Sequence, residues 1–147
     1  MMKIMFVCTG NTCRSAMAEC ILKKLIKDEK IEGVKITSAG LNVTEAEMNS
    51  YARKALNELG VKPRKFLPKQ ITEKLLKSHN AIICMTKKHK DALYGFNNLY
   101  TVSELAKIDG DVIDPYGKDY ETYIETAKLL YKSCSIILNL IKEELKI

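Results

Sequence analysis

Short apolar runs alternate along the chain with segments in which apolar residues recur every three or four positions. Four runs have the length of β-strands: residues 3–7, 34–38, 81–85 and 99–102. The first is apolar without alternation, which is typical of a strand buried on both faces of a sheet. Strands that alternate with helical patterns in this way predict an α/β fold with a parallel sheet.

The longest helical pattern covers residues 120–145, where apolar side chains stand three and four positions apart, as in an amphipathic helix packed on a sheet. We expect one three-layer domain over residues 1–147, a four-stranded parallel sheet flanked by helices. Ligands of such open sheets bind beyond the carboxyl ends of the strands. The other expected helices are 14–29, 49–59 closed by Gly60, a short helix starting near Thr72, and 87–94 ended by Gly95.

The composition is that of a folded globular protein. Of the 147 residues, 46% are hydrophobic and 29% are charged, which excludes a disordered or fibrous chain. No apolar run approaches the roughly 20 residues that span a bilayer. The apolar stretch 4–7 is too short for a signal peptide, whose core needs ~7–15 residues. We therefore expect a cytoplasmic protein without a membrane partner.

The net charge of +6 admits an acidic partner, including nucleic acid. However, the lysines are dispersed along the chain, with Lys87, Lys88 and Lys90 as the densest group, and no aromatic residues interleave a basic stripe. Most lysines are therefore expected on solvated helix surfaces. Nucleic acid is not an expected partner, and a steep salt dependence of DNA binding would be needed to support one.

Five cysteines stand at positions 8, 13, 20, 84 and 134, an odd number. Three of them, at 20, 84 and 134, lie in apolar stretches, where a cysteine behaves as a small hydrophobic residue. His79 and His89 are far from any Cys-x2-Cys pair, the spacing typical of zinc sites. We expect neither a metal nor a cofactor.

The segment that follows the first strand carries the clearest chemical pattern. It reads Val7-Cys8-Thr9-Gly10-Asn11-Thr12-Cys13-Arg14-Ser15 and then continues as a helix. The backbone N–H groups of such a tight, glycine-containing turn point into a concavity, and the helix N-terminus adds partial positive charge. The loop therefore predicts a binding site for a dianionic tetrahedral group.

Two side chains convert this anion site into a candidate reaction centre. Cys8 lies at its base, where the positive field favours the thiolate, a nucleophile facing phosphorus. Arg14 offers a bidentate fork to two phosphoryl oxygens, and Ser15 can donate a hydrogen bond to the thiolate. The loop matches neither the Walker A nor the dinucleotide-binding pattern. The alternative is that Cys8 ends a buried strand and Arg14 pairs on the surface.

A cysteinyl-phosphate mechanism also needs an acid that protonates the leaving atom. Asp114 precedes Pro115 just before the last helix, and proline restricts the backbone of both residues. A carboxylate on a rigid loop suits this role, although Asp-Pro alone is a common turn. The combination with the Cys8 loop makes Asp114 the candidate general acid.

Four motifs over nearly the whole chain resemble the low-molecular-weight protein tyrosine phosphatase family. They are Cys-Thr-Gly-Asn-Thr-Cys-Arg-Ser at 8–15, Met-Ala-Glu at 17–19, Ser-Ala-Gly at 38–40 and Asp-Pro-Tyr at 114–116. The resemblance implies a phosphatase domain with Cys8 as nucleophile, Arg14 as transition-state ligand and Asp114 as acid and then base. It also implies that Asn11, Ser15 and Ser38 hold the loop in a strained shape. The residues expected to bind phosphate or substrate are Thr9, Gly10, Asn11, Thr12, Cys13, Ser15 and Tyr116.

The chain departs from many members of the family in two places. Residues 66–70, Phe-Leu-Pro-Lys-Gln, replace a His-x-Ala-Arg-Gln stretch, so a supporting histidine contact is absent or replaced. Thr12 stands where the tyrosine phosphatases often have Ile, and one aromatic residue, Tyr116, stands where they often have two. Thr12 and the single aromatic residue resemble the bacterial branch that acts on phosphoarginine in proteins.

The substrate class can be argued from the residues at the pocket. A phosphoguanidinium presents N–H donors, which the Thr12 hydroxyl and a carboxylate can accept, whereas phosphotyrosine presents a flat ring that methyl groups and aromatic residues would grip. We therefore expect phosphorylated proteins as partners, with phosphoarginine as the substrate and phosphotyrosine as the alternative. Thr12 alternatively only stabilises a turn. A monomer is expected, although nothing in the sequence determines the oligomeric state.

Other functions fit the pattern less well. Arsenate reductases of the same fold pass electrons through further cysteines, but Cys84 has no partner between it and Cys134. A binding module that captures phosphate without turnover would not explain Cys8, Arg14 and Asp114 together. We also consider that mild oxidant links Cys8 to Cys13 in a reversible inactive state; the alternative is that Cys13 is inert packing.

Overall fold

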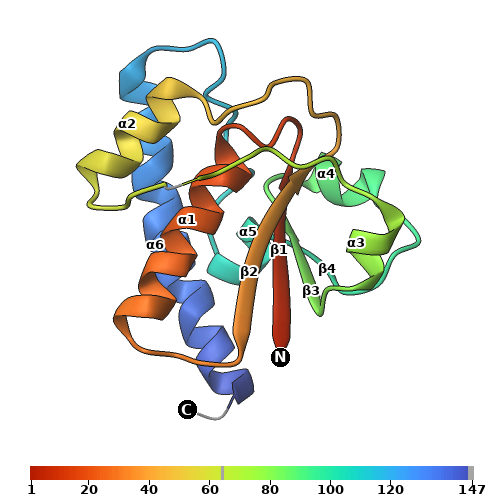
Figure 1. Cartoon of the computed structure of the whole chain (residues 1–147). Helices are drawn as coiled ribbons and strands as arrows, with labels where there is room; N and C mark the ends of the chain where they lie inside the picture. The colour runs from red at the N-terminus through yellow and green to blue at the C-terminus, as the bar shows by residue number, and fades with distance from the viewer. Residues whose placement is uncertain (64, 146–147) are drawn as a thin grey trace.

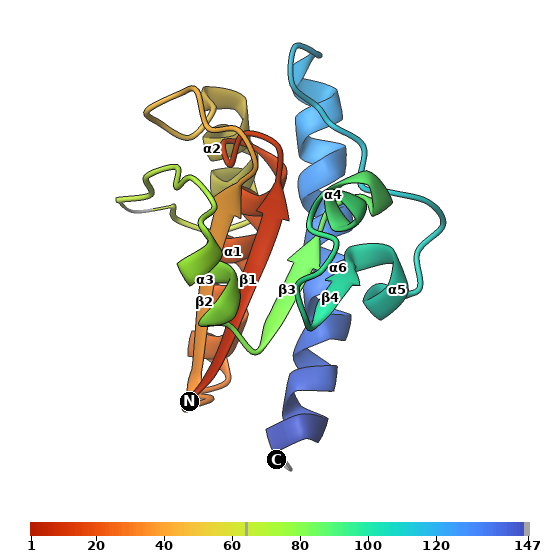
Figure 2. The ribbon, with the colours of Figure 1, turned by 90° about the vertical axis from the view of Figure 1, so that its right-hand side faces the viewer.

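The computed structural model describes residues 1–63 and 65–145 and contains a four-stranded sheet (Figures 1 and 2). All strands are parallel, and their order is β2-β1-β3-β4. The fold class predicted from the sequence is therefore confirmed, and each predicted strand boundary lies within two residues of the observed one. The strands are β1 (Met2–Cys8), β2 (Val34–Gly40), β3 (Ala81–Cys84) and β4 (Leu99–Thr101).

Six helices are described, five of them at predicted positions. The one that the sequence analysis missed is α5, and the assignment of Val102 to a strand was wrong. Thr101 and Glu104 form a capping box, in which each side chain accepts from the other's backbone N–H, so a helix begins directly where β4 ends. The helices are α1 (Arg14–Asp28), α2 (Ser50–Glu58), α3 (Glu73–Lys77), α4 (Lys87–Ala92), α5 (Val102–Ala106) and α6 (Tyr120–Leu145).

The helices cover both faces of the sheet and make three layers. In Figure 1, α1 and α6 lie to the left of the sheet and α3 and α4 to its right. Phe6 of β1 packs in the larger core with apolar residues of α1, α2, α5 and α6, whereas Met5 packs on the opposite face with Leu76 and Leu93. None of the described helices is long and apolar enough to cross a membrane.

The sheet register places the end of β1 beside the end of β2. Cys8, the last residue of β1, lies opposite Gly40. A Cβ at Gly40 would lie 2.8 Å from the carbonyl oxygen of Thr9, so only glycine allows the loop to approach this closely. The N–H groups of Leu41 and Asn42 donate to the carbonyls of Cys8 and Thr9. The loop after β1 is thus anchored to the segment that follows β2.

Candidate active site

Residues 8–15 curl into a cradle with the thiol of Cys8 at its base. The backbone N–H of Asn11 donates to Cys8 Sγ at 3.3 Å, and Ser15 Oγ lies 2.8 Å from the same sulfur. Helix α1 begins at Arg14, and the side chain of its N-cap residue, Cys13, makes no capping hydrogen bond in the described part of the chain. Its N-terminal N–H groups therefore remain available to an anion bound in the cradle.

Asn11 holds the cradle in its shape. Its φ is +57°, in the left-handed region that non-glycine residues seldom adopt. The buried side-chain amide donates to Ser15 Oγ at 2.8 Å and to Ser38 Oγ at 2.9 Å, while its oxygen accepts from the backbone N–H of Lys69 at 2.9 Å. Ser38 in turn donates to a carboxylate oxygen of Glu19 at 2.6 Å. These bonds offset the strained backbone conformation.

The segment 66–70 contacts the catalytic loop through the backbone of Lys69. This segment lacks the histidine that many family members have there, yet the backbone of Lys69 reaches the loop network directly. Phe66 is buried in the core and fixes the same segment. In this chain a main-chain hydrogen bond from the same segment therefore supports the loop network.

Arg14 and Asp114 meet at the mouth of the cradle, although 100 positions separate them in the sequence. The guanidinium is buried and donates to the carbonyl of Val112 at 3.2 Å. Its second terminal nitrogen lies 3.5 Å from Asp114 Oδ2. The Asp114 side chain is 51% exposed, and its other oxygen accepts from the backbone N–H of Tyr116. The carboxylate is thus held beside the cation and still reaches solvent.

The cradle opens into a cavity of about 230 Å³. Eight of the ten residues expected to act on or bind the substrate line it. Asn11 and Ser15 lie behind the loop instead, together with Ser38, where their side chains contact one another rather than the cavity. The lining residues are Cys8, Thr9, Gly10, Thr12, Cys13, Arg14, Asn42, Thr44, Glu45, Asp114 and Tyr116.

Comparison with known proteins assigns the chain to a family. Residues 3–147 match the family model described as low molecular weight phosphotyrosine protein phosphatase. The chain belongs to this family. Its members include the low molecular weight protein-tyrosine-phosphatase PtpB of Staphylococcus haemolyticus, which is 39% identical over 136 residues, 88% of this chain and 94% of that protein. Hydrolysis of phosphorylated substrates is thereby established as the activity class.

Relatives named as arginine phosphatases are similar to this phosphatase as well. The protein-arginine-phosphatase of Bacillus subtilis is 33% identical over 132 residues, 85% of this chain and 87% of that protein. The solved structure of the YwlE arginine phosphatase from Geobacillus stearothermophilus superposes with a TM-score of 0.87 at 29% identity, covering 99% of this chain and 97% of that one. The four-stranded parallel architecture is therefore shared with these enzymes.

The segment after β2 brings residues to the phosphatase cavity that the sequence analysis missed. Asn42, Thr44 and Glu45 line its rim, and Glu45 accepts a hydrogen bond from the Tyr116 hydroxyl at 3.1 Å. No motif marks this polar segment. This segment follows a strand of the sheet, and binding sites of such folds lie at the carboxyl ends of strands. That rule could have identified the segment from the sequence.

His89 is the other unforeseen neighbour of the cradle. Its Nε2 lies 2.9 Å from Thr9 Oγ1. Burial, and then the positive charge of Arg14, lower the pKa of His89 to about 4. A neutral imidazole at this position steadies the loop without adding charge. No motif in the sequence points to this contact of His89 with the loop.

Cys13 lies against the last helix. Its sulfur is 3.7 Å from the hydroxyl of Tyr123 on α6 and 3.7 Å from Thr12 Oγ1. Burial raises the pKa of the Cys13 thiol, which makes Cys13 a poor nucleophile. The two cysteines of the loop therefore stand in different chemical environments.

Proposed function

We propose that this phosphatase works through a covalent cysteinyl-phosphate on Cys8. The observation that carries the proposal is the position of the Cys8 sulfur, in a loop that leads into the N-terminus of α1 and in the cavity that Arg14 also lines. In the first step the thiolate attacks phosphorus, an S–P bond forms and the bond to the leaving atom breaks. The cradle N–H groups and the Arg14 fork bind the phosphoryl oxygens, whose charge they neutralise in the transition state.

Asp114 supplies the proton in both steps. Its protonated carboxyl donates to the leaving atom as that bond breaks. The resulting carboxylate then accepts a proton from a water molecule whose oxygen attacks the phosphocysteine. The S–P bond breaks, inorganic phosphate leaves and the Cys8 thiolate is restored. The exposed position of the carboxyl at the cavity mouth suits exchange with both leaving group and water.

We further propose that the substrate is phosphoarginine in proteins. Thr12 is 6% exposed and lines the cavity. Among the described residues, its hydroxyl has only the long contact to the Cys13 sulfur, so it is available to accept from a substrate N–H. Glu45 and Asp114 place two carboxylates around the mouth of an otherwise anion-binding pocket. A phosphoguanidinium, unlike phosphotyrosine, carries the positive charge and the N–H donors that these groups favour.

Phosphotyrosine is the second candidate. Tyr116 lines the cavity and is largely exposed, so its ring offers an apolar wall to a phenyl group. Relatives named as tyrosine phosphatases also match the chain. Against this interpretation, the Tyr116 hydroxyl donates to Glu45, which holds a carboxylate at the cavity wall, and a carboxylate favours a cation over an apolar ring. The five free cysteines support a cytoplasmic setting, where we expect the phosphatase to act on phosphorylated proteins as a monomer.

The mechanism is tested by trapping the intermediate. Wild-type protein quenched in acid during turnover should carry one phosphoryl group, which peptide mapping should place on Cys8. Cys8→Ser should abolish turnover and yet bind orthovanadate, because the N–H groups of the cradle remain. Activity above a few per cent in Cys8→Ser, or a phosphoryl group on another residue, would remove Cys8 from the role of nucleophile.

A further inference from the structure

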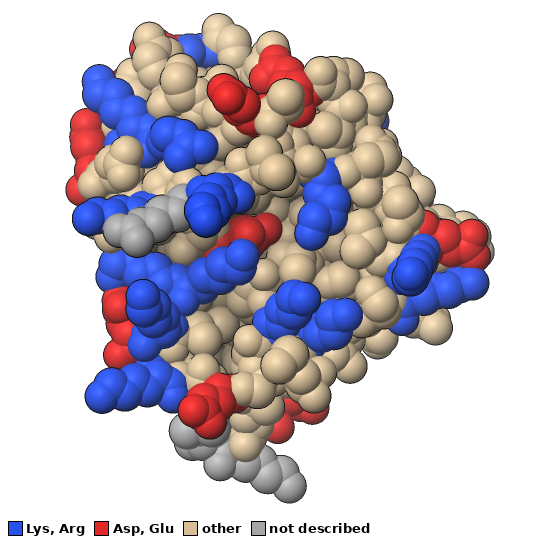
Figure 3. Space-filling model, in the orientation of Figure 1, with Lys and Arg blue, Asp and Glu red and all other residues tan. Residues whose placement is uncertain are grey.

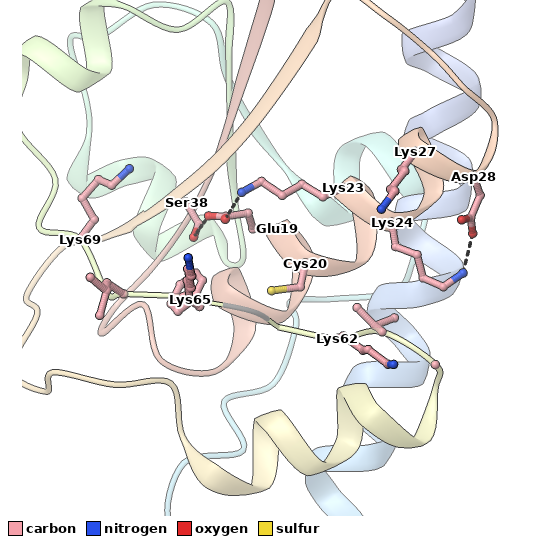
Figure 4. A pocket seen from close by; sticks show the side chains of 14 residues that line it. Glu19, Cys20, Lys23, Lys24, Lys27, Asp28, Ser38, Lys62, Lys65 and Lys69 are labelled. Atoms are coloured by element: carbon pink, nitrogen blue, oxygen red, sulfur yellow. Dashed lines mark hydrogen bonds and ion pairs between the residues drawn. The ribbon is translucent and has the colours of Figure 1, made fainter.

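A second pocket, larger than the catalytic cavity, lies between α1 and residues 60–62 and 65–69 (Figure 4), and none of its described lining residues belongs to the catalytic cavity. Its volume is about 620 Å³. The lysines are dispersed along the sequence, but six of them line this one pocket in the folded protein. They are Lys23, Lys24, Lys27, Lys62, Lys65 and Lys69.

The pocket concentrates positive charge. Among the described lining residues, two carboxylates, Glu19 and Asp28, accompany the six lysines, so these residues carry a net charge of +4. Lys23 pairs with Glu19 at 2.7 Å and Lys24 pairs with Asp28 at 2.5 Å. The other four lysines form no ion pair within the described part of the chain. Figure 3 shows blue side chains crowded over α1 and the segment after α2, with few red atoms among them.

Several cations around one hollow repel one another unless an anion lies between them. The volume falls in the range of about 300–1,000 Å³ that holds small molecules, which favours a compact ligand over an extended nucleic acid or a protein surface. Lysine ammonium groups are compact point charges with three donors each, and they suit the separate oxygens of a phosphate chain. The ligand class that fits is therefore a small anion with several phosphates.

We propose that this lysine pocket binds an oligophosphate and that its occupancy is transmitted to the catalytic loop. The pocket wall is joined to the loop by hydrogen bonds. Lys23 contacts Glu19, Glu19 accepts from Ser38, and Ser38 accepts from Asn11, with distances of 2.7, 2.6 and 2.9 Å. The backbone of Lys69, another lining residue, donates directly to Asn11.

Anion binding shifts the balance of this network. A phosphate that attracts Lys23 deprives Glu19 of its cation, and a largely buried carboxylate without a counter-ion is costly. The negative charge of the bound phosphate also repels the Glu19 carboxylate, so the bond from Ser38 to Glu19 lengthens and the strained turn at Asn11 loses part of its support. Turnover is therefore expected to fall when the pocket is occupied.

Binding is tested by calorimetry with inorganic tripolyphosphate at constant ionic strength. The catalytic cradle also binds phosphates, so Arg14→Ala serves to separate the sites and should retain the tripolyphosphate affinity of the pocket. The double variant Lys27→Gln/Lys62→Gln should bind at least tenfold more weakly. Its matched control is Lys128→Gln/Lys132→Gln, which removes the same charge from the exposed side of α6 and should change affinity less than twofold.

A variant that binds tripolyphosphate more tightly cannot owe its effect to misfolding. Asp28→Asn removes a carboxylate from the pocket and frees Lys24, so tripolyphosphate should bind at least threefold more tightly. Glu73→Gln is its control, because it breaks the same kind of lysine pair on α3 and should leave affinity unchanged. If Arg14→Ala loses all tripolyphosphate binding, or if pocket and control variants change the affinity equally, the lysine pocket is not the binding site.

The link to catalysis is tested at saturating substrate, where competition in the cradle no longer contributes. Tripolyphosphate should lower kcat of the wild type at least twofold and leave kcat of Lys27→Gln/Lys62→Gln unaffected. An unchanged kcat in the wild type, or an equal fall in both proteins, would contradict transmission through Glu19. These readouts use any hydrolysed phosphate ester, so they do not depend on which substrate the phosphatase prefers.

Discussion

Replacement of Thr12 separates the two candidate substrates. Thr12→Val removes the hydroxyl and keeps the shape of the side chain, whereas Thr12→Ser keeps the hydroxyl and removes a methyl group. The side chain is buried at the cavity wall and its hydroxyl makes only a 3.7 Å contact to Cys13 Sγ. Neither change breaks a strong hydrogen bond of the free protein, so both variants are expected to fold normally.

The size of the effect follows from the burial of Thr12. If its hydroxyl accepts from the substrate guanidinium, Thr12→Val leaves that N–H donor unpaired in the closed complex, which costs about 1–3 kcal/mol. At about 1.4 kcal/mol per factor of ten, this cost corresponds to a loss of roughly five- to 140-fold in kcat/KM for phosphoarginine. The added methyl group should leave kcat/KM for phosphotyrosine unchanged or higher, because it packs against a ring. Thr12→Ser should resemble the wild type.

The assay is kcat/KM on phosphoarginine and phosphotyrosine peptides for the wild type and both variants. Thermal unfolding of each variant checks that the fold is intact. If the ratio of the two kcat/KM values is the same in Thr12→Val as in the wild type, Thr12 does not select the substrate. Phosphotyrosine would then be the better-supported substrate.

Three further predictions address the acid, the second loop cysteine and the buried histidine. Asp114→Asn should lower kcat by about 10²–10⁴-fold for a poor leaving group and less for an activated one; equal losses on both would contradict the assignment. Mild peroxide should link Cys8 to Cys13, which peptide mapping would detect, whereas sulfinic Cys8 alone would exclude the disulfide. Because the pKa of His89 falls from 6.5 to about 4 on folding, the unfolded chain binds more protons in that range, and the free energy of unfolding should decrease as pH is lowered through it. His89→Gln should flatten this decrease in urea titrations, and an identical slope would rule the contribution out.

Much of the fold is encoded in local patterns. The uninterrupted apolar run of β1 and the long amphipathic repeat of α6 identify their elements without tertiary information, and α6 has the predicted bounds, Tyr120–Leu145. The end of β4 was harder to predict, because the capping box that starts α5 overrides the apolar pattern around Val102. The periodicity of the sequence does not show whether Val102 belongs to the strand or to the helix that the capping box starts.

The candidate site, like the fold, was predictable from the sequence only in part. The 8–15 loop and Asp114 were recognisable because their residue types and spacing carry the chemistry. Glu45 and His89 were not, since each reaches the cavity or the loop through long-range packing and lies in no motif. The lysine pocket is the clearest case, because its six lysines come from two segments of the chain that the fold brings together. Their dispersal along the sequence concealed their proximity in space.

The measurement that tests the central claim most directly is kcat/KM of the wild-type phosphatase on two peptides of identical sequence, one carrying phosphoarginine and the other phosphotyrosine. A polar cavity wall at Thr12 with carboxylates at its mouth predicts a clear preference for the phosphoarginine peptide, by at least tenfold. An equal rate, or a preference for the phosphotyrosine peptide, would contradict the proposed substrate.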